Sequence, residues 1–331
     1  MTERVLVTGI TGYIGQHCGA ELLNQGYEVV GTIRSRAKGD AAKAAIAAVA
    51  PVDKLSFVEA DLLSDVGWDD AMQGCTYVLH VASPFFVAPP KDDNELITPA
   101  VEGTKRVISA AQRAEVRRVV LTSSVASMTA GKVGGPYGPE SWSDTNADIG
   151  AYSMSKTLAE RAAWDLIETG GMEMTVINPG AVVGPSLGAR IDGQSVSMMA
   201  DMLNGKMPMI PDLAFGMIDV RDVARLHVEA LKAEGAAGKR FVAASAEPVE
   251  LMSLAKTLKN AGYKKVSTRK APKPLLKVIG LFDRDVKGLL PGLGKRVTLD
   301  NSATLDILSW EPTPIETSVT DMAEAIELMS R

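Results

Sequence analysis

A tyrosine and a lysine lie four positions apart in the segment Tyr152-Ser153-Met154-Ser155-Lys156. This spacing places both side chains on one face of a helix. A phenol has a pKa of about 10, so it needs help to exchange a proton at neutral pH. A lysine cation one turn away stabilises the phenolate, and we expect it to lower the pKa of Tyr152. An ordinary amphipathic helix can carry the same pair, so the pattern needs support from other motifs.

Hydroxyl side chains follow an apolar run that begins at Val119, namely Thr122, Ser123 and Ser124. Proteins with parallel sheets bind their ligands at the carboxyl ends of the strands. We expect Ser124 to donate to the oxygen of a substrate carbonyl. Ser123 is the adjacent alternative, because only one of two neighbours on a strand faces the site. Ser124, Tyr152 and Lys156 are therefore the candidate catalytic residues, and Thr122 is a candidate cofactor contact.

Three glycines, at 9, 12 and 15, join an apolar run at 5–8 to a helix pattern. The first permits a tight turn, the second lets backbone N–H groups approach a pyrophosphate, and the third lets the helix pack closely on the strand. A glycine-rich turn without a ligand is the alternative, but the order strand, turn and helix favours a dinucleotide. The expected contacts are Thr8, Gly9, Thr11, Gly12, Tyr13, Ile14 and Gly15.

Basic residues follow the second apolar run, at Arg34, Arg36 and Lys38, and no acid precedes Asp40. A carboxylate here would accept from a ribose 2′-hydroxyl, whereas a cation pairs with a 2′-phosphate. The sequence therefore favours NADP (NADPH) over NAD, with Arg34 and Lys38 as the contacts. A solvated basic loop is the alternative.

Further cofactor and substrate contacts are expected at the ends of the third and fourth runs. Asp61 could accept from the adenine amine while Leu62 packs on the ring, and capping a helix is the competing role for Asp61. Val81, Ala82 and Ser83 would line the nicotinamide side. Phe85 and Phe86 offer an apolar wall for the substrate, together with Ser124 and Tyr152, or they anchor their loop in the core.

The elements that position these residues alternate along the first half of the chain. Short apolar runs at 5–8, 28–33, 55–60, 77–82 and 119–123 are separated by helix-length segments, which is typical of repeated βαβ units. The runs lack polar alternation, as strands covered on both faces require. We therefore predict an α/β fold of the Rossmann type, a doubly wound parallel sheet.

Later segments extend this sheet and add a smaller interleaved lobe at the C-terminal end. Strands are expected at 174–178 and 240–244, a strand leading into a helix at 217–231, and helices at 251–261 and 314–330. We assign 1–180 to an NADP-binding domain to which 215–245 returns. Residues 181–214 and 246–331 form the substrate-binding lobe.

The composition excludes several classes of protein. The chain is 46% hydrophobic with a net charge of −5 and has no dense run of Lys or Arg, which favours a small-molecule partner over nucleic acid. No apolar stretch approaches the roughly 18 residues of a membrane span, and no secretory pattern follows Met1, so we expect a cytoplasmic protein. Two cysteines and three scattered histidines indicate neither a disulfide framework nor a metal site. A monomer or a homodimer is expected.

Taken together, five motifs resemble the extended short-chain dehydrogenases, and more narrowly the group of dihydroflavonol 4-reductase, cinnamoyl-CoA reductase and the methylglyoxal-type aldehyde reductases. They are residues 8–15, Asp61-Leu62, Ser124, 152–156 and the run Asn178-Pro179-Gly180-Ala181-Val182-Val183-Gly184-Pro185. The resemblance implies that NADPH delivers a hydride to an aldehyde or ketone and that Tyr152 protonates the product. It further implies a nicotinamide wall of Pro179, Gly180, Ala181 and Val182, and a pyrophosphate contact at Ser195.

Other functions are compatible with parts of this pattern. A sugar-nucleotide epimerase or dehydratase that retains NAD tightly is the first alternative, but Ala100 stands where those relatives have an asparagine. A non-catalytic NADP-binding protein is the second, and the Tyr152 and Lys156 pair argues against it. A steroid dehydrogenase ranks last, because such relatives carry a membrane-associating segment that this chain lacks.

Overall fold

The computed structural model describes residues 2–84, 92–188 and 193–329. Its centre is a seven-stranded sheet in the order β11-β7-β5-β4-β1-β2-β3, with every neighbouring pair parallel. The strands are β1 (Arg4–Thr8), β2 (Glu28–Ile33), β3 (Leu55–Glu59), β4 (Tyr77–His80), β5 (Arg118–Thr122), β7 (Glu173–Pro179) and β11 (Arg240–Ala243). The predicted doubly wound sheet is confirmed.

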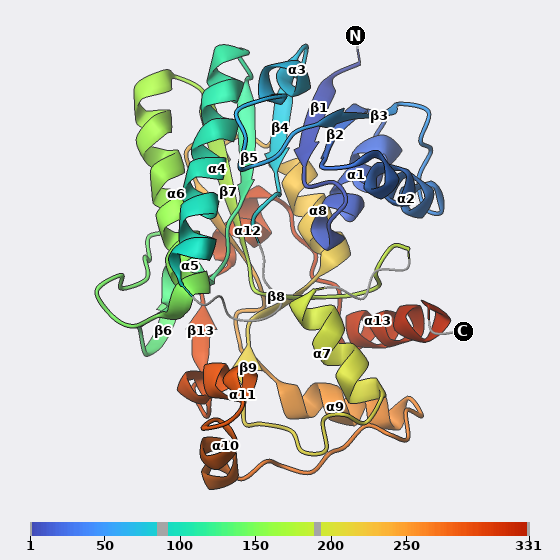
Figure 1. Cartoon of the computed structure of the whole chain (residues 1–331), viewed down its shortest axis with the longest axis vertical. Coiled ribbons are helices and arrows are strands. Elements are labelled where there is room, and N and C mark those ends of the chain that lie inside the picture. The colour runs from blue at the N-terminus through green and yellow to red at the C-terminus, as the bar shows by residue number, and fades with distance from the viewer. Residues whose placement is uncertain (1, 85–91, 189–192, 330–331) are drawn as a thin grey trace.

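Helices cover both faces of this sheet, as the apolar strands require. One face packs on α1 (Tyr13–Asn24), α2 (Arg36–Ala47) and α8 (Val220–Glu229). The other packs on α3 (Trp68–Met72), α4 (Asn94–Arg113) and α6 (Gly150–Gly170). In Figure 1 the sheet and these helices fill the upper half of the molecule.

A third apolar cluster lies below the carboxyl ends of the strands (Figure 1). It is built largely from α7 (Gln194–Leu203), α9 (Leu251–Asn260) and α13 (Ile315–Met329). Short strands frame it: β8 (Ala181–Val183) pairs with β10 (Met217–Asp219), and β9 (Ala214–Phe215) pairs with β12 (Val249–Glu250). The remaining helical elements are α5 (Ala126–Thr129), α10 (Lys273–Ile279), α11 (Arg284–Leu289), the 3₁₀ turn η1 (Leu290–Gly292) and α12 (Ser302–Ile307). Among the described residues, every helix is too short or too polar to cross a lipid bilayer.

The segment 131–146 has no strand pattern in the sequence, yet it contains β6 (Gly134–Tyr137), which pairs with β13 (Val297–Leu299). A run of Gly-Gly-Pro-Tyr has little strand preference of its own. Its partner lies more than 150 positions away in the sequence, so pairing with a distant segment determines this strand.

The last part of the chain also returns to the main sheet. Leu308 and Trp310 are buried in the cluster that contains Val223 and Phe241. Thr304 Oγ1 donates to the main-chain oxygen of Val242 at 2.8 Å. Part of the segment 246–331, which we assigned to the smaller lobe, therefore completes the core of the larger domain.

A buried carboxylate holds the C-terminal segment against the main sheet. Asp222, which is 1% exposed, accepts from Trp310 Nε1 at 3.1 Å and from Thr313 N and Oγ1 at 2.8 Å each. It also pairs with Arg225. Because α8 holds the carboxylate, these bonds fix the C-terminal segment to the face of the main sheet.

We expect Asp222→Ala to lower the free energy of unfolding by about 2–4 kcal/mol, because it leaves the buried Trp310 N–H without its acceptor. Urea unfolding followed by tryptophan fluorescence measures this loss. Asp65→Ala is the matched control: Asp65 is 85% exposed and pairs only with Arg106 at the surface, so its removal should cost less than about 1 kcal/mol. Equal losses in the two variants would contradict the assigned role of Asp222.

Candidate functional site

The glycine loop follows β1 and has the backbone geometry that the sequence predicts. Gly9 has φ +67°, and a Cβ there would lie 2.9 Å from Ala82 Cα. A Cβ on Gly15 would lie 2.2 Å from the Gly9 oxygen, so only glycine allows α1 to pack this closely. Gly12 is the N-cap of α1 and has no side chain to cap it. The N-terminal N–H groups of α1 are therefore available to an anion such as a pyrophosphate.

Side-chain hydroxyls hold this loop against the neighbouring strands. Thr8 Oγ1 accepts from Ala82 N at 3.0 Å and lies 2.8 Å from His80 Nδ1. Burial lowers the pKa of His80 to about 3, so the ring is neutral and Nδ1 can accept the Thr8 proton. Thr32 Oγ1 accepts from Gly9 N at 3.1 Å, a contact that the sequence analysis missed. In the sequence, Thr32 stands out only as a hydroxyl near the end of an otherwise apolar strand.

The basic residues after β2 are free to meet a ligand. Arg34 and Lys38 are exposed at the start of α2. Within the described residues neither cation has an ion-pair partner. Two unpaired cations at the end of the second strand fit a 2′-phosphate.

Several other expected cofactor contacts use their polar groups within the protein. The Tyr13 hydroxyl donates to the Gly184 oxygen at 2.7 Å. The main chain of Tyr13 is therefore the part that can contact a cofactor bound at the glycine loop. Asp61 Oδ1 accepts from Leu63 N at 3.0 Å, so this carboxylate caps a turn. Leu62 packs against Gly103, where a Cβ would lie 2.8 Å from Leu62 Cβ.

The remaining expected contacts frame the same edge of the sheet. Ile14, Val81 and Val182 are partly buried against the core of the main sheet. Pro179 ends β7, Ala181 begins β8, and a Cβ on Gly180 between them would lie 2.1 Å from the Gly216 oxygen. Thr11, Ala82, Ser83 and Ser195 are partly buried as well. Phe85 and Phe86 lie outside the described residues.

The two adjacent serines after β5 face different neighbours. Ser123 Oγ donates to Glu160 Oε2 at 2.5 Å, away from the glycine loop. Ser124 Oγ accepts from Ala126 N at 3.1 Å and lies 3.5 Å from the Pro179 oxygen, and it is close enough to Tyr152 to lower the pKa of that phenol. Ser124 is thus the serine next to Tyr152. The Thr122 hydroxyl lies 2.6 Å from His227 Nε2, so Thr122 presents its main-chain oxygen, not its hydroxyl, to Lys156.

Tyr152 has a pKa above its ordinary value, contrary to our expectation from the sequence. Although 41% of the residue is accessible, protein atoms around its hydroxyl desolvate it, and this burial raises the pKa more than the nearby Ser124 hydroxyl lowers it. The phenol is therefore protonated at neutral pH. It is poised to donate a proton rather than to accept one.

Lys156 lies one turn after Tyr152 on α6, and its Nζ donates to the Thr122 oxygen at 3.4 Å. Burial lowers the pKa of this amine to about 8, while the charge of Glu160 raises it. The amine is still mostly protonated at neutral pH. Ser124, Tyr152 and Lys156 are thus brought together at the carboxyl end of β5.

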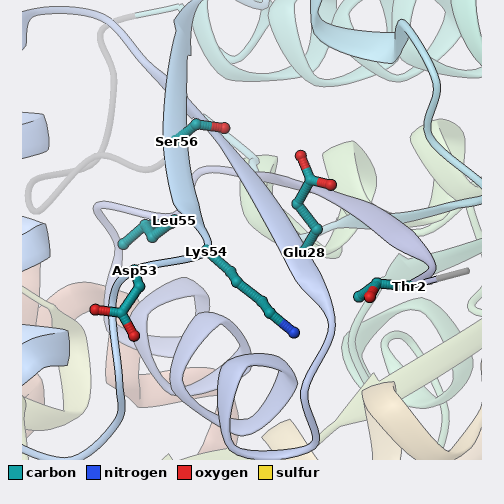
Figure 2. A pocket seen from close by; sticks show the side chains of 6 residues that line it. All are labelled: Thr2, Glu28, Asp53, Lys54, Leu55 and Ser56. Carbon is teal, nitrogen blue, oxygen red and sulfur yellow. The ribbon is translucent and has the colours of Figure 1, made fainter.

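A shallow surface hollow lies elsewhere, at the amino ends of β2 and β3 (Figure 2). Its lining includes Glu28, which pairs with Arg4, and Lys54, whose Nζ donates to the Gly26 oxygen at 3.0 Å. These two of its three charged residues already have partners; the third is Asp53. This hollow presents no reactive group comparable to those at the opposite edge of the sheet.

Comparison with known proteins points to one family. The model of the NAD dependent epimerase/dehydratase family matches residues 5–244. Cinnamoyl-CoA reductase CAD2 of Medicago truncatula is 35% identical over 246 residues, covering 71% of this chain and 74% of that protein. The putative NADPH-dependent methylglyoxal reductase GRP2 of Candida albicans is 33% identical over 267 residues, covering 72% and 77%.

A solved relative supports the same conclusion over the full length. The yeast methylglyoxal/isovaleraldehyde reductase Gre2, complexed with NADPH, superimposes with a TM-score of 0.80 at 25% identity and covers 99% of both chains. The family match spans most of the chain, and the relatives just named fall in the group that the sequence motifs indicated. The chain therefore belongs to the NAD dependent epimerase/dehydratase family, the extended short-chain dehydrogenases.

Proposed function

We propose that this chain is an NADPH-dependent carbonyl reductase that converts an aldehyde or ketone to an alcohol, reversibly. The observation that carries the proposal is the proximity of the Ser124 hydroxyl to Tyr152 at the end of β5, with Lys156 one helical turn from Tyr152 and bonded to the Thr122 oxygen. They lie at the carboxyl edge of the sheet, where the glycine loop packs against Ala82.

The cofactor is NADP(H). The glycine cradle at Gly9 and Gly15, the uncapped N-terminus of α1 and the unpaired cations Arg34 and Lys38 fit its pyrophosphate and 2′-phosphate. The relatives that are described as NADPH-dependent or as NADPH complexes support this assignment. When bound, the nicotinamide would supply the hydride that adds to the carbonyl carbon.

The residues of the chain supply the proton and stabilise the charge. Ser124 donates to the carbonyl oxygen, which holds the carbonyl in place and polarises it. As the carbon accepts the hydride, the oxygen becomes an alkoxide, and Tyr152 transfers its phenolic proton to it. The Lys156 ammonium then stabilises the phenolate that remains until a proton from solvent restores it. The raised pKa of Tyr152 suits this direction, since the acid must be protonated before it can donate.

The substrate is a small molecule, and the relatives point to two carbonyl classes, a coenzyme A thioester and an α-keto aldehyde. We assign the apolar wall to Phe85 and Phe86 as a proposal from the sequence. Ala100, 3% exposed within α4, argues against the sugar-nucleotide alternative, because it has no side-chain amide. We expect the enzyme to work in the cytoplasm as a monomer or a homodimer.

We predict that Tyr152→Phe lowers kcat for NADPH-dependent reduction by about 10²–10⁴, because it removes the proton donor and leaves the ring in place. NADPH oxidation at 340 nm with a panel of aromatic aldehydes and α-keto compounds measures this change. Tyr27→Phe is the control, since Tyr27 directly precedes β2, at the amino end of the sheet and opposite the site. It should keep the wild-type rate.

Two results would overturn the proposed function. Undiminished turnover in Tyr152→Phe would remove the phenol from the reaction. Tightly bound NAD, identified by mass spectrometry in the purified protein, together with no oxidation of added NADPH, would favour the epimerase alternative.

We predict that Arg34→Ala raises the Kd for NADPH by about 10- to 100-fold, because a charge-assisted bond to phosphate contributes roughly 1.5–3 kcal/mol. The Kd for NADH, which has no 2′-phosphate, should change less than about threefold. Isothermal titration calorimetry measures both. Lys54→Ala, which removes an exposed cation at the other end of the sheet, should leave both values unchanged. Equal losses for the two nucleotides would reject Arg34 as the 2′-phosphate contact.

A further inference from the structure

A carboxylate that takes no part in the proposed chemistry is buried beside the site. Glu160 follows Lys156 by one turn of α6, and its side chain is 0% exposed. Burying a charge is costly unless the charge is paired and hydrogen-bonded. We therefore expect a cation and several hydrogen-bond donors around the Glu160 carboxylate.

The partners of Glu160 come from three strands and strand ends of the sheet. Oε1 accepts from Arg240 Nε, on β11, at 2.5 Å. Oε2 accepts from Ser123 Oγ at 2.5 Å, from Ser127 Oγ at 2.7 Å and from Asn178 Nδ2, on β7, at 3.0 Å. One carboxylate thus joins α6 to the carboxyl ends of β5 and β7 and to β11.

Arg240, whose side chain is 7% exposed, is equally well held on its other side. Its NH1 group donates to the main-chain oxygens of Pro139 and Ser141 at 2.7 and 2.6 Å. Its guanidinium also lies over the ring of Trp142 at 3.9 Å. The ion pair is therefore a fixed unit with little freedom to rearrange.

Two of the Glu160 partners also hold the main chain of Ser124. Asn178 Nδ2 donates to the Ser124 oxygen at 3.2 Å, and the Ser127 hydroxyl, whose single proton is shared between Glu160 Oε2 and the Ser124 oxygen, lies 2.8 Å from that oxygen. The orientation of the Ser124 main chain determines where its hydroxyl points. Loss of the carboxylate would leave Asn178 and Ser127 without their common acceptor and would loosen Ser124.

Glu160 also acts on Lys156 through its charge. The charged group that acts on the Lys156 amine from its own helix is Glu160. Burial and the Lys156 charge together lower the pKa of His80 on β4, so that ring is neutral. Burial lowers the pKa of Lys156 to about 8, and the negative charge of Glu160 opposes that fall. Arg240, the cation that pairs with Glu160, is the other charged group of this cluster.

We propose that Glu160, paired with Arg240, is a positioning residue for carbonyl reduction, which fixes the Ser124 main chain and sets a negative charge one helical turn from Lys156. The inference rests on the proposed function. It assigns Glu160 no contact with substrate or cofactor.

Glu160→Gln tests both parts, because the amide removes the charge and presents an N–H where the carboxylate accepts. We expect kcat to fall about 10- to 100-fold, the size of effect that a displaced catalytic group produces, with the Kd for NADPH within twofold of wild type. Reduction needs the ammonium form, so activity falls as the pH rises through the Lys156 pKa. Without Glu160 this alkaline limb should move down by about one pH unit.

A measurement without cofactor reports on the same charge. In protein labelled with ¹³C at lysine Cε, the resonance missing from Lys156→Met identifies Lys156. Its titration midpoint in Glu160→Gln should lie about one unit below that of wild type. A merely structural role for Glu160 would leave this midpoint unchanged.

Two further variants distinguish a positioning role of Glu160 from a general loss of folding. The double variant Glu160→Gln, Arg240→Met removes both buried charges, so its melting temperature should return to that of wild type. Its activity should still fall at a lower pH than that of wild type. Glu173→Gln is the matched control: Glu173 pairs with Arg118 at the opposite end of β5, at 2.7 Å. It should change neither kcat nor the limb.

The outcomes separate this inference from the proposed function. If wild-type protein reduces no carbonyl compound, the proposed function fails, while the ¹³C titration still decides whether Glu160 sets the ionisation of Lys156. If wild type is active and folded Glu160→Gln keeps its kcat within twofold and its alkaline limb in place, Glu160 is not a positioning residue.

Discussion

The candidate site depends on the in-register parallel pairing of β1, β4 and β5. Thr8 lies beside His80, and His80 lies beside Leu121, so these three strands reach their carboxyl ends at the same level. The glycine loop, the segment after β4 and Ser124 therefore emerge side by side. A shift of one residue would move every side chain of a strand to the opposite face of the sheet, where it would meet a different set of packed helices, so the core of the sheet also fixes the geometry of the site.

The second determinant is the helix that crosses this edge. Tyr152, Lys156 and Glu160 share one stripe of α6, since each lies four residues from the next. Solvent accessibility falls along this stripe, from the partly exposed phenol of Tyr152 to the fully buried carboxylate of Glu160. The Glu160 carboxylate at the closed end thus acts on the Lys156 amine, which lies midway along the stripe.

Much of the fold and part of the site could be predicted from the sequence. The seven strands were visible as apolar runs, and the glycine spacing fixed the turn geometry at Gly9 and Gly15. The choice between Ser123 and Ser124 could not be made, because alternation says that one of them faces the site but not which one. The pKa direction of Tyr152 was wrong, since local spacing shows the nearby lysine but not the atoms that bury the phenol. The partnership of Glu160 with Arg240 joins residues 80 positions apart, and no local pattern reports such a pairing.

The fastening of the C-terminal segment has a consequence for how the chain is made. Asp222, on α8, pairs with Arg225 of the same helix, but its acceptors for Trp310 and Thr313 are used only once the C-terminal segment arrives, and Trp310 completes the core against that helix. A nascent chain that has emerged only as far as β11 has every strand of the main sheet but leaves this apolar face of α8 uncovered. The dinucleotide-binding half therefore cannot finish folding during synthesis until almost the whole polypeptide has left the ribosome, and until then its exposed face is a site for chaperone binding or aggregation.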